Sequence, residues 1–155
     1  MLPTFGSLLA LREVPKLAKA IWTSPALLMR DQGVCLRSRC RVVDNSEIGK
    51  QAMMEGKPPR VIHVYVKKTK KGARAQGLLG NKVLVTIKGQ MKKAIIVGLV
   101  RRQAAFVPKF DSNNIVLIDD KGSPLGNRIL VPIPNLLRDQ RYGWNKLISI
   151  ATKFV

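Results

Sequence analysis

The sequence contains few of the residues that catalysis and metal binding require. Among 155 residues there is one histidine, His63, and there are nine acidic side chains. His63 lies inside an apolar run typical of a strand, so we expect a packing or RNA-facing role for it. Asp119-Asp120 leads into Lys-Gly, which is typical of a turn rather than a metal site. Since these residues supply no set of nucleophile, base and orienting group, we predict that the protein is not an enzyme and uses no metal or cofactor.

Cysteine is also scarce, with Cys35 and Cys40 alone in the chain. A structural zinc site needs four ligands, so this pair cannot form one by itself. If both residues lie in one strand, they are about 16 Å apart and face opposite sides of it. A disulfide needs Cα atoms within about 7 Å of each other, so two free thiols are expected. A ligand role shared with another chain stays open.

Aromatic residues make up 5% of the chain, and no uncharged apolar run reaches 18 residues. The missing apolar run argues against a membrane protein. The low aromatic content argues against a base-stacking platform of the kind that single-strand binders use. Structured RNA, recognised by its shape and backbone, is therefore the favoured partner. A free single-stranded nucleic-acid-binding protein built on an OB-like barrel is the alternative.

Positive charge is what the chain has in excess. It carries 28 Lys and Arg and a net charge of +19, and its 46% hydrophobic content predicts a folded body rather than a disordered tail. Fourteen Lys or Arg and no acid lie between Gly56 and Phe110. This charge favours a polyanionic partner, with a merely solvated face as the alternative. The predicted RNA-binding residues are Arg37, Arg39, Arg41, Lys50, Arg60, Lys67, Lys68, Lys70, Lys71, Arg74, Lys82, Lys88, Lys92, Lys93, Arg101, Arg102 and Lys109.

The first thirty residues differ in composition from the rest. They are rich in Leu and Ala and contain four basic residues but one acid, Glu13. A basic, acid-poor segment able to form an amphipathic helix resembles a mitochondrial transit peptide. A secretory signal is disfavoured, because the apolar run precedes most of the charges. We predict that residues 1–30 are a transit peptide or a flexible N-terminal arm, that residues 31–155 form one domain, and that the protein is located in the mitochondrial matrix.

The body reads as short strands separated by turns. Apolar alternation and flanking turn residues predict strands at Val34–Val43, Arg60–Lys68, Val83–Lys88, Lys93–Val100, Ile115–Asp119 and Arg128–Val131. Asp44-Asn45-Ser46 ends the first strand, and the third and fourth are expected to form a hairpin across Gly89-Gln90. In the first strand, period-two alternation places Arg37, Arg39 and Arg41 on one face. Several short strands at this spacing predict a small closed barrel.

The C-terminal part has a different pattern. Pro132 and Pro134 end the strand-like sequence, and the following segment reads as a short helical turn that begins near Asn135. Between Trp144 and Phe154, apolar residues recur at helical spacing. The spacing predicts a small amphipathic helix that covers the barrel.

Four segments, in this order, resemble the L-fourteen family of large-subunit ribosomal proteins: RVVDNSEIGK, KVLVTIKGQMKKAIIVGLVRR, FDSNNIVLID and GSPLGNRILVPIP. The most specific block is AIIV followed by Phe110, Asn113, Val116 and Leu117 at the family's spacing. The resemblance covers residues 34–155. Together with the transit-like N-terminus, it points to the mitochondrial form.

The resemblance implies a mainly β fold, a small five-stranded OB-like β-barrel with a projecting β-ribbon and short C-terminal helices. It implies a structural constituent of the mitochondrial large ribosomal subunit, bound to large-subunit rRNA and neighbouring proteins and to small-subunit rRNA at an intersubunit bridge. It also implies docking of the ribosome silencing factor on Asn127, Arg128 and Lys146, without a homo-oligomer or a membrane. Two local departures, Glu47 in place of a glycine and a shortened 101–109 loop, alter the geometry expected there.

Overall fold

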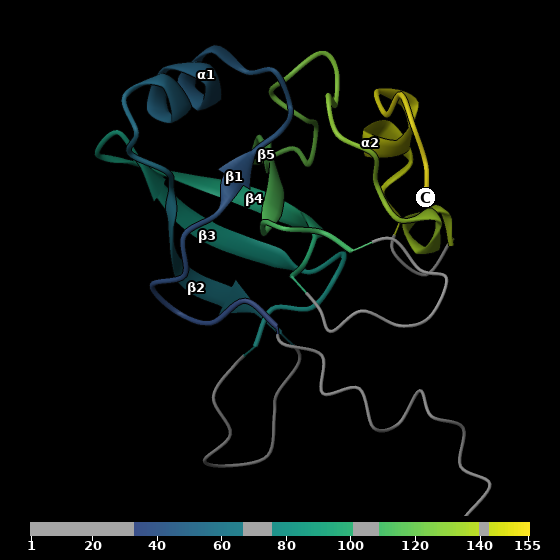
Figure 1. Cartoon of the computed structure of the whole chain (residues 1–155), viewed down its shortest axis with the longest axis horizontal. Coiled ribbons are helices and arrows are strands. Elements are labelled where there is room, and N and C mark those ends of the chain that lie inside the picture. The colour runs from purple at the N-terminus through teal and green to yellow at the C-terminus, as the bar shows by residue number, and fades with distance from the viewer. Residues whose placement is uncertain (1–32, 67–75, 101–108, 140–142) are drawn as a thin grey trace, which may run out of the picture. The chain divides into compact units, whose positions relative to one another are not determined.

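A five-stranded mixed sheet forms the centre of the protein (Figure 1). The computed structural model describes residues 33–66, 76–100, 109–139 and 143–155. The strand order is β1-β5-β4-β3-β2, with β1 Arg41–Val42, β2 Arg60–Tyr65, β3 Lys82–Ile87, β4 Gln90–Gly98 and β5 Asn114–Ile118. The mainly β fold is confirmed, and four of the strands, β2 to β5, begin and end within three residues of the predicted ranges.

The β3–β4 hairpin turns at Lys88-Gly89, one residue earlier than predicted. Ile87 and Gln90 are cross-strand partners, and the two residues between them have positive φ values of 48° and 77°. Two positive φ values in a two-residue loop make a type I′ turn, whose twist matches that of the strands. The tip of this hairpin extends to the side of the body below helix α1, Glu47–Met54 (Figure 1).

The sheet is open, so the predicted closed barrel overstates it. β1 and β2 are its two edges, and in the described ranges no ladder joins them. The chain before β1 spans part of this gap. Arg39 and Arg60 form an isolated antiparallel bridge, and the Val61 N–H donates to the Ser38 carbonyl at 3.0 Å.

The predicted strand Val34–Val43 is wrong over most of its length. Within it, only β1 is a strand, and β1 pairs in parallel with β5. The chain turns at Arg37, whose φ is 67°, and the Cys35 N–H donates to Ser38 Oγ at 3.2 Å. Such local side-chain bonds compete with an extended ladder. The three arginines predicted on one strand face therefore do not share a regular strand.

β2 is confirmed, although its predicted end at Lys68 lies outside the described residues. The pairing with β3 shifts register between Val61 and His63. The irregularity leaves His63 exposed, with its ring edge-on to Tyr65 at a centroid distance of 5.0 Å. The single histidine thus faces solvent rather than the core.

Helix α1 has no counterpart among the predicted elements. Ser46 caps it from an extended conformation (φ −70°, ψ 147°), and its Oγ accepts the Gly49 N–H at 3.3 Å. Glu47 occupies the first turn, where a carboxylate interacts favourably with the helix dipole. The departure at Glu47 therefore falls at the start of a helix. Gly49 is buried so closely against β1 that an added Cβ would lie 2.5 Å from Val42 Cγ1.

The C-terminal part packs beside the sheet as two short helices and an extended tail (Figure 1). The helical turn expected near Asn135 is confirmed as the 3-10 helix η3, Asn135–Arg138. The predicted helix Trp144–Phe154 is too long, since α2 covers only Asn145–Ser149. Beyond it the chain is extended. The predicted strand Arg128–Val131 is replaced by isolated parallel bridges, which pair Ile129 with Ala151 and Ile133 with Phe154.

A single aliphatic cluster forms the core. It combines side chains from all parts of the sheet with Ile129, Ile133, Leu137 and Leu147 of the C-terminal part, each of them buried. This shared core fixes the C-terminal part on the sheet. In the described ranges, no helix has the length and apolar content needed to cross a membrane.

Candidate nucleic-acid interface

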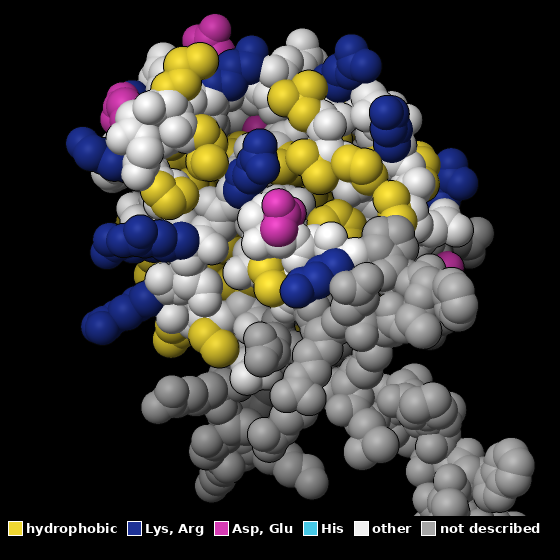
Figure 2. Space-filling model, viewed as in Figure 1, with side chains coloured by type: hydrophobic (Ala, Val, Ile, Leu, Met, Phe, Trp, Pro, Cys, Tyr) yellow, Lys and Arg dark blue, Asp and Glu magenta, His cyan; other side chains and the backbone are white. Residues whose placement is uncertain are grey.

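The predicted RNA-binding residues that the structure describes all reach the surface. Figure 2 shows Lys and Arg side chains spread over the face in view, with few acidic ones among them. The exposed ones are Arg37, Arg39, Arg41, Lys50, Arg60, Lys82, Lys88 and Lys109, and Lys92 and Lys93 are half-buried. Outside the described residues lie Lys67, Lys68, Lys70, Lys71, Arg74, Arg101 and Arg102.

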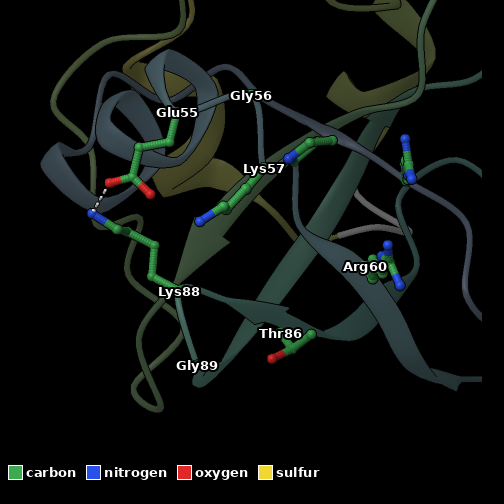
Figure 3. Close-up of a pocket in the computed structure, with 9 residues that line it drawn as sticks. Glu55, Gly56, Lys57, Arg60, Thr86, Lys88 and Gly89 are labelled. Atoms are coloured by element: carbon green, nitrogen blue, oxygen red, sulfur yellow. Dashed lines mark ion pairs between the residues drawn. The ribbon is translucent and has the colours of Figure 1, made fainter.

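A pocket of about 710 Å³ gathers part of this charge. Figure 3 shows Glu55 and Lys88 joined at one side of it, Arg60 at the opposite side, and Lys57 between them in this view. Three of its four cations were predicted from the sequence, and Lys57 was missed although it lies in the acid-free stretch. The lining residues are Arg39, Glu55, Gly56, Lys57, Pro58, Arg60, Thr86, Lys88 and Gly89.

Lys57 is placed by the way α1 ends. Gly56 adopts a φ of 67°, its N–H donates to the Met53 carbonyl at 3.1 Å, and the Lys57 N–H donates to the Ala52 carbonyl at 3.0 Å. These two bonds with a left-handed residue between them make a Schellman motif, which satisfies the last carbonyls of a helix. Pro58 follows and prevents the helix from continuing. The backbone that carries Lys57 is therefore fixed.

The opposite wall is a row of neighbours on adjacent strands. Arg39 is the bridge partner of Arg60, and Arg60 is the cross-strand partner of Thr86. Side chains of such partners lie on the same face and close together. Like charges directly opposite each other are destabilising, and in the described part of the chain neither arginine has an acidic partner. The two neighbouring arginines therefore have no acidic counter-ion among the described residues.

The one carboxylate of the pocket is already occupied. Glu55 Oε1 lies 2.6 Å from Lys88 Nζ, which also donates to Gln51 Oε1 at 3.1 Å. The hydrogen bond from Lys88, its charge and the charge of Lys57 hold the pKa of Glu55 below its ordinary value. Glu55 therefore stays ionised and pairs with Lys88, so a single carboxylate faces the four cations that line the pocket.

Two other predicted cations are engaged within the protein. Lys93 Nζ lies 2.8 Å from Asp120 Oδ1, and this contact raises the pKa of Lys93 and lowers that of Asp120. Lys82 Nζ lies 5.0 Å from the centre of the Trp144 ring, a cation–π contact. These two lysines are less available to an external anion than Lys57 at the pocket.

Asn127, Arg128 and Lys146 gather around the loop that follows β5. Asn127 and Arg128 belong to this loop and are exposed. Lys146 comes from α2, and its Nζ donates to Ser123 Oγ in the same loop at 3.0 Å. The Asn45 Nδ2 donates to Asn127 Oδ1 at 2.9 Å. Lys146 therefore contacts the same loop that carries Asn127 and Arg128.

Asp44 supports this loop, a role that sequence reasoning missed. Its buried carboxylate accepts bonds from Ser46 N–H at 3.1 Å, Ser46 Oγ at 2.7 Å and Leu117 N–H at 3.0 Å. An added Cβ on Gly126 would lie 1.5 Å from the Asp44 carbonyl oxygen. The loop backbone thus rests directly on the Asp44 turn. The turn-forming run Asp44-Asn45-Ser46 was the one local indication in the sequence that Asp44 has a structural role. That run did not indicate that the carboxylate of Asp44 bonds to Leu117.

The described residues contain no group of three or more His, Cys, Asp or Glu able to hold a metal ion. Cys35 is half-buried, Cys40 is buried, and both are free thiols. Burial raises the pKa of Cys40 to about 12. A buried thiol that stays protonated is a poor nucleophile. Cys40 is therefore not a reactive group.

Comparison with known proteins agrees with this picture of a basic, non-catalytic surface. The sequence matches the family described as ribosomal protein L14p/L23e over residues 33–155. The large ribosomal subunit protein uL14m of Danio rerio is 49% identical over 118 residues, which cover 76% of this chain and 78% of that relative. The chain therefore belongs to the ribosomal protein L14 family, as a mitochondrial member without enzymatic activity.

Proposed function

We propose that this structural constituent of the mitochondrial large ribosomal subunit binds large-subunit rRNA through its basic surface. The observation that carries the proposal is the group of four cations at one pocket, whose single lining carboxylate, Glu55, is paired with Lys88. RNA phosphates supply the missing negative charge and fix the position of the protein without reading sequence. Neighbouring large-subunit proteins are the expected protein partners.

Salt dependence tests RNA binding. Because each neutralised phosphate releases counterions, the affinity for a large-subunit rRNA fragment should fall steeply between about 50 and 200 mM salt. The variant Lys57→Gln should flatten the slope by about one phosphate contact. Lys153→Gln, at an exposed residue outside the pocket, is the control and should keep the slope. A flat profile for the unmodified protein would contradict phosphate binding.

We further propose that the loop surface of Asn127, Arg128 and Lys146 docks the ribosome silencing factor. The family resemblance supports this assignment, as do the exposure of the loop and the bond from Lys146 to Ser123. Arg128→Glu and Lys146→Glu should each weaken capture of purified silencing factor, since charge reversal repels an acidic partner surface. Lys50→Glu on α1 is the control for an exposed cation elsewhere. Unchanged capture by both loop variants would remove the site.

The same surface is our candidate for the contact with small-subunit rRNA at an intersubunit bridge, which the family resemblance also implies. A photo-crosslinker at exposed Lys121, next to this loop, should recover small-subunit rRNA from assembled ribosomes. A crosslinker at Lys57 should recover large-subunit rRNA instead. Recovery of large-subunit rRNA alone from Lys121 would place the bridge elsewhere.

Residues 1–30, which lie outside the described residues, are proposed to direct import into mitochondria. Their basic, acid-poor composition supports this role. Mass spectrometry of the protein from purified mitochondrial ribosomes should find its N-terminus between Trp22 and Gly33. A mature chain that retains the segment would instead favour the N-terminal arm.

A further inference from the structure

The pocket between α1 and the sheet is larger than contact with a phosphate requires. Its volume of about 710 Å³ falls in the range of about 300–1,000 Å³ that is typical of small-molecule sites. Gly56 and Gly89 line it, and a Cβ added to either would meet nothing within 4 Å. Neutralising a phosphate requires cations but not a hollow of this size. The hollow is partly open to solvent and has room for a ligand larger than a phosphate group.

The cations of the pocket are of two kinds, on two walls. The sheet wall presents the guanidinium groups of Arg39 and Arg60, and Lys57 and Lys88 approach from the helix end and the hairpin turn (Figure 3). Guanidinium planes stack on unpaired nucleobases, whereas a lysine ammonium acts on phosphate as a point charge. Thr86, beside Arg60, adds a hydroxyl that can donate and accept hydrogen bonds.

We propose that this pocket holds a single unpaired ribonucleotide extruded from an RNA helix, with its base against Arg39 and Arg60 and its phosphate toward Lys57. The proposal rests on the rRNA binding proposed above and goes beyond it, because the pocket then distinguishes a bulged strand from a paired one. None of the lining residues is aromatic, so the site accommodates one base rather than the successive bases that aromatic platforms stack. The pairing of Glu55 with Lys88 reduces repulsion between that carboxylate and the phosphate.

The test uses the full chain and three fluorescent RNA hairpins with the same stem. One is fully paired, one has a single-nucleotide bulge, and one has an abasic residue at the bulge. At one fixed salt concentration, the bulged hairpin should bind about fivefold more tightly than the paired one, the factor that a single guanidinium–base contact supplies. The abasic hairpin should lose this preference. Equal affinity for the bulged and paired hairpins, or for the bulged and abasic ones, overturns the proposal.

Two pocket variants make the test specific. Arg39→Gln/Arg60→Gln and Thr86→Val should both reduce the preference for the bulged hairpin, and valine at a strand position on the outer face preserves the fold. Lys153→Gln should leave the preference unchanged. A preference retained by both pocket variants overturns the proposal. If the unmodified protein showed no salt-dependent binding to any of the three hairpins, rRNA binding itself would be contradicted. Failure of the nucleotide-pocket proposal and failure of the rRNA-binding proposal are therefore distinguishable.

A free nucleotide would offer the pocket the same base and phosphate as an extruded nucleotide of an RNA. Adenosine monophosphate at a concentration equal to that of the bulged hairpin should not displace it, because the stem adds phosphate contacts that the free nucleotide lacks. Displacement at equal concentration would reassign the pocket to free nucleotides and overturn the proposal for RNA.

Discussion

Replacing Gly126 with alanine tests how closely the loop after β5 is held against the Asp44 turn. An added Cβ would lie 1.5 Å from the Asp44 carbonyl oxygen and 2.4 Å from its carbonyl carbon. Real Cβ contacts are essentially never shorter than 3.0 Å, so the Cβ and that oxygen must separate by at least 1.5 Å. Because both contacted atoms belong to the backbone, no side-chain rotation relieves the overlap.

The cost follows from the hydrogen bonds beside the overlap. The Leu125 N–H donates to the Leu117 carbonyl at 3.0 Å, and the Leu130 N–H donates to the Val43 carbonyl at 3.1 Å. Loss of one such bond costs about 1 kcal/mol, and overpacking of a rigid site costs about 1–3 kcal/mol. We expect the free energy of unfolding to fall by about 2–4 kcal/mol. For a body of this size, the thermal midpoint should fall by about 8–16 °C.

Thermal unfolding followed by circular dichroism measures this difference. Gly122→Ala is the matched control, since Gly122 lies in the same loop and an added Cβ there meets nothing within 4 Å. Its φ of 76° makes alanine cost about 1 kcal/mol through backbone conformation alone. Gly126→Ala should be clearly less stable than this control and should capture the silencing factor more weakly. Equal midpoints for the two variants would refute the steric reasoning.

Two further predictions concern residues outside this loop. Burial raises the pKa of Cys40 from 9.0 to about 12. The contribution of this thiol to stability should therefore be full below pH 9.0 and should decline as the pH rises toward 12. Urea unfolding measured across this pH range should show the decline in the unmodified protein, and the part due to Cys40 should be absent from Cys40→Ala. Trp144→Phe removes the Nε1–H that donates to the Gly80 carbonyl at 3.0 Å and should lower the free energy of unfolding by about 1 kcal/mol; an unchanged urea midpoint would show that this bond contributes nothing.

The central strands were predictable because their signal is local. β3 alternates between buried and partly exposed residues, and the second half of β4 and most of β5 are buried apolar runs. The exposure of the lysines and arginines was also predictable, since these side chains are almost never fully buried without a partner. Their gathering at a pocket was not. It depends on a helix cap at Gly56 and on a bridge between Arg39 and Arg60, which no periodicity records.

The errors have the same origin. The run before β1 has the composition of a strand, but a positive φ at Arg37 and the bond from Cys35 to Ser38 break the ladder there. Ala151 and Phe154 fit a helical spacing, yet parallel bridges to Ile129 and Ile133 hold them in an extended chain. In both places, contacts outside the segment or a single backbone angle override the pattern within it. The role of Asp44 was hidden for the same reason, because Leu117 lies 73 residues away.

That separation also governs the order in which the sheet can assemble. β2, β3, β4 and β5 are neighbours both in the sequence and across the sheet, so each can pair as soon as the next strand is available. β1 is synthesised before all of them but pairs with β5, and closing so long a loop costs more entropy than closing a hairpin. We therefore expect docking of β1 to limit the folding rate. Until it docks, a nascent chain leaves one edge of β5 unpaired and Asp44 exposed to solvent.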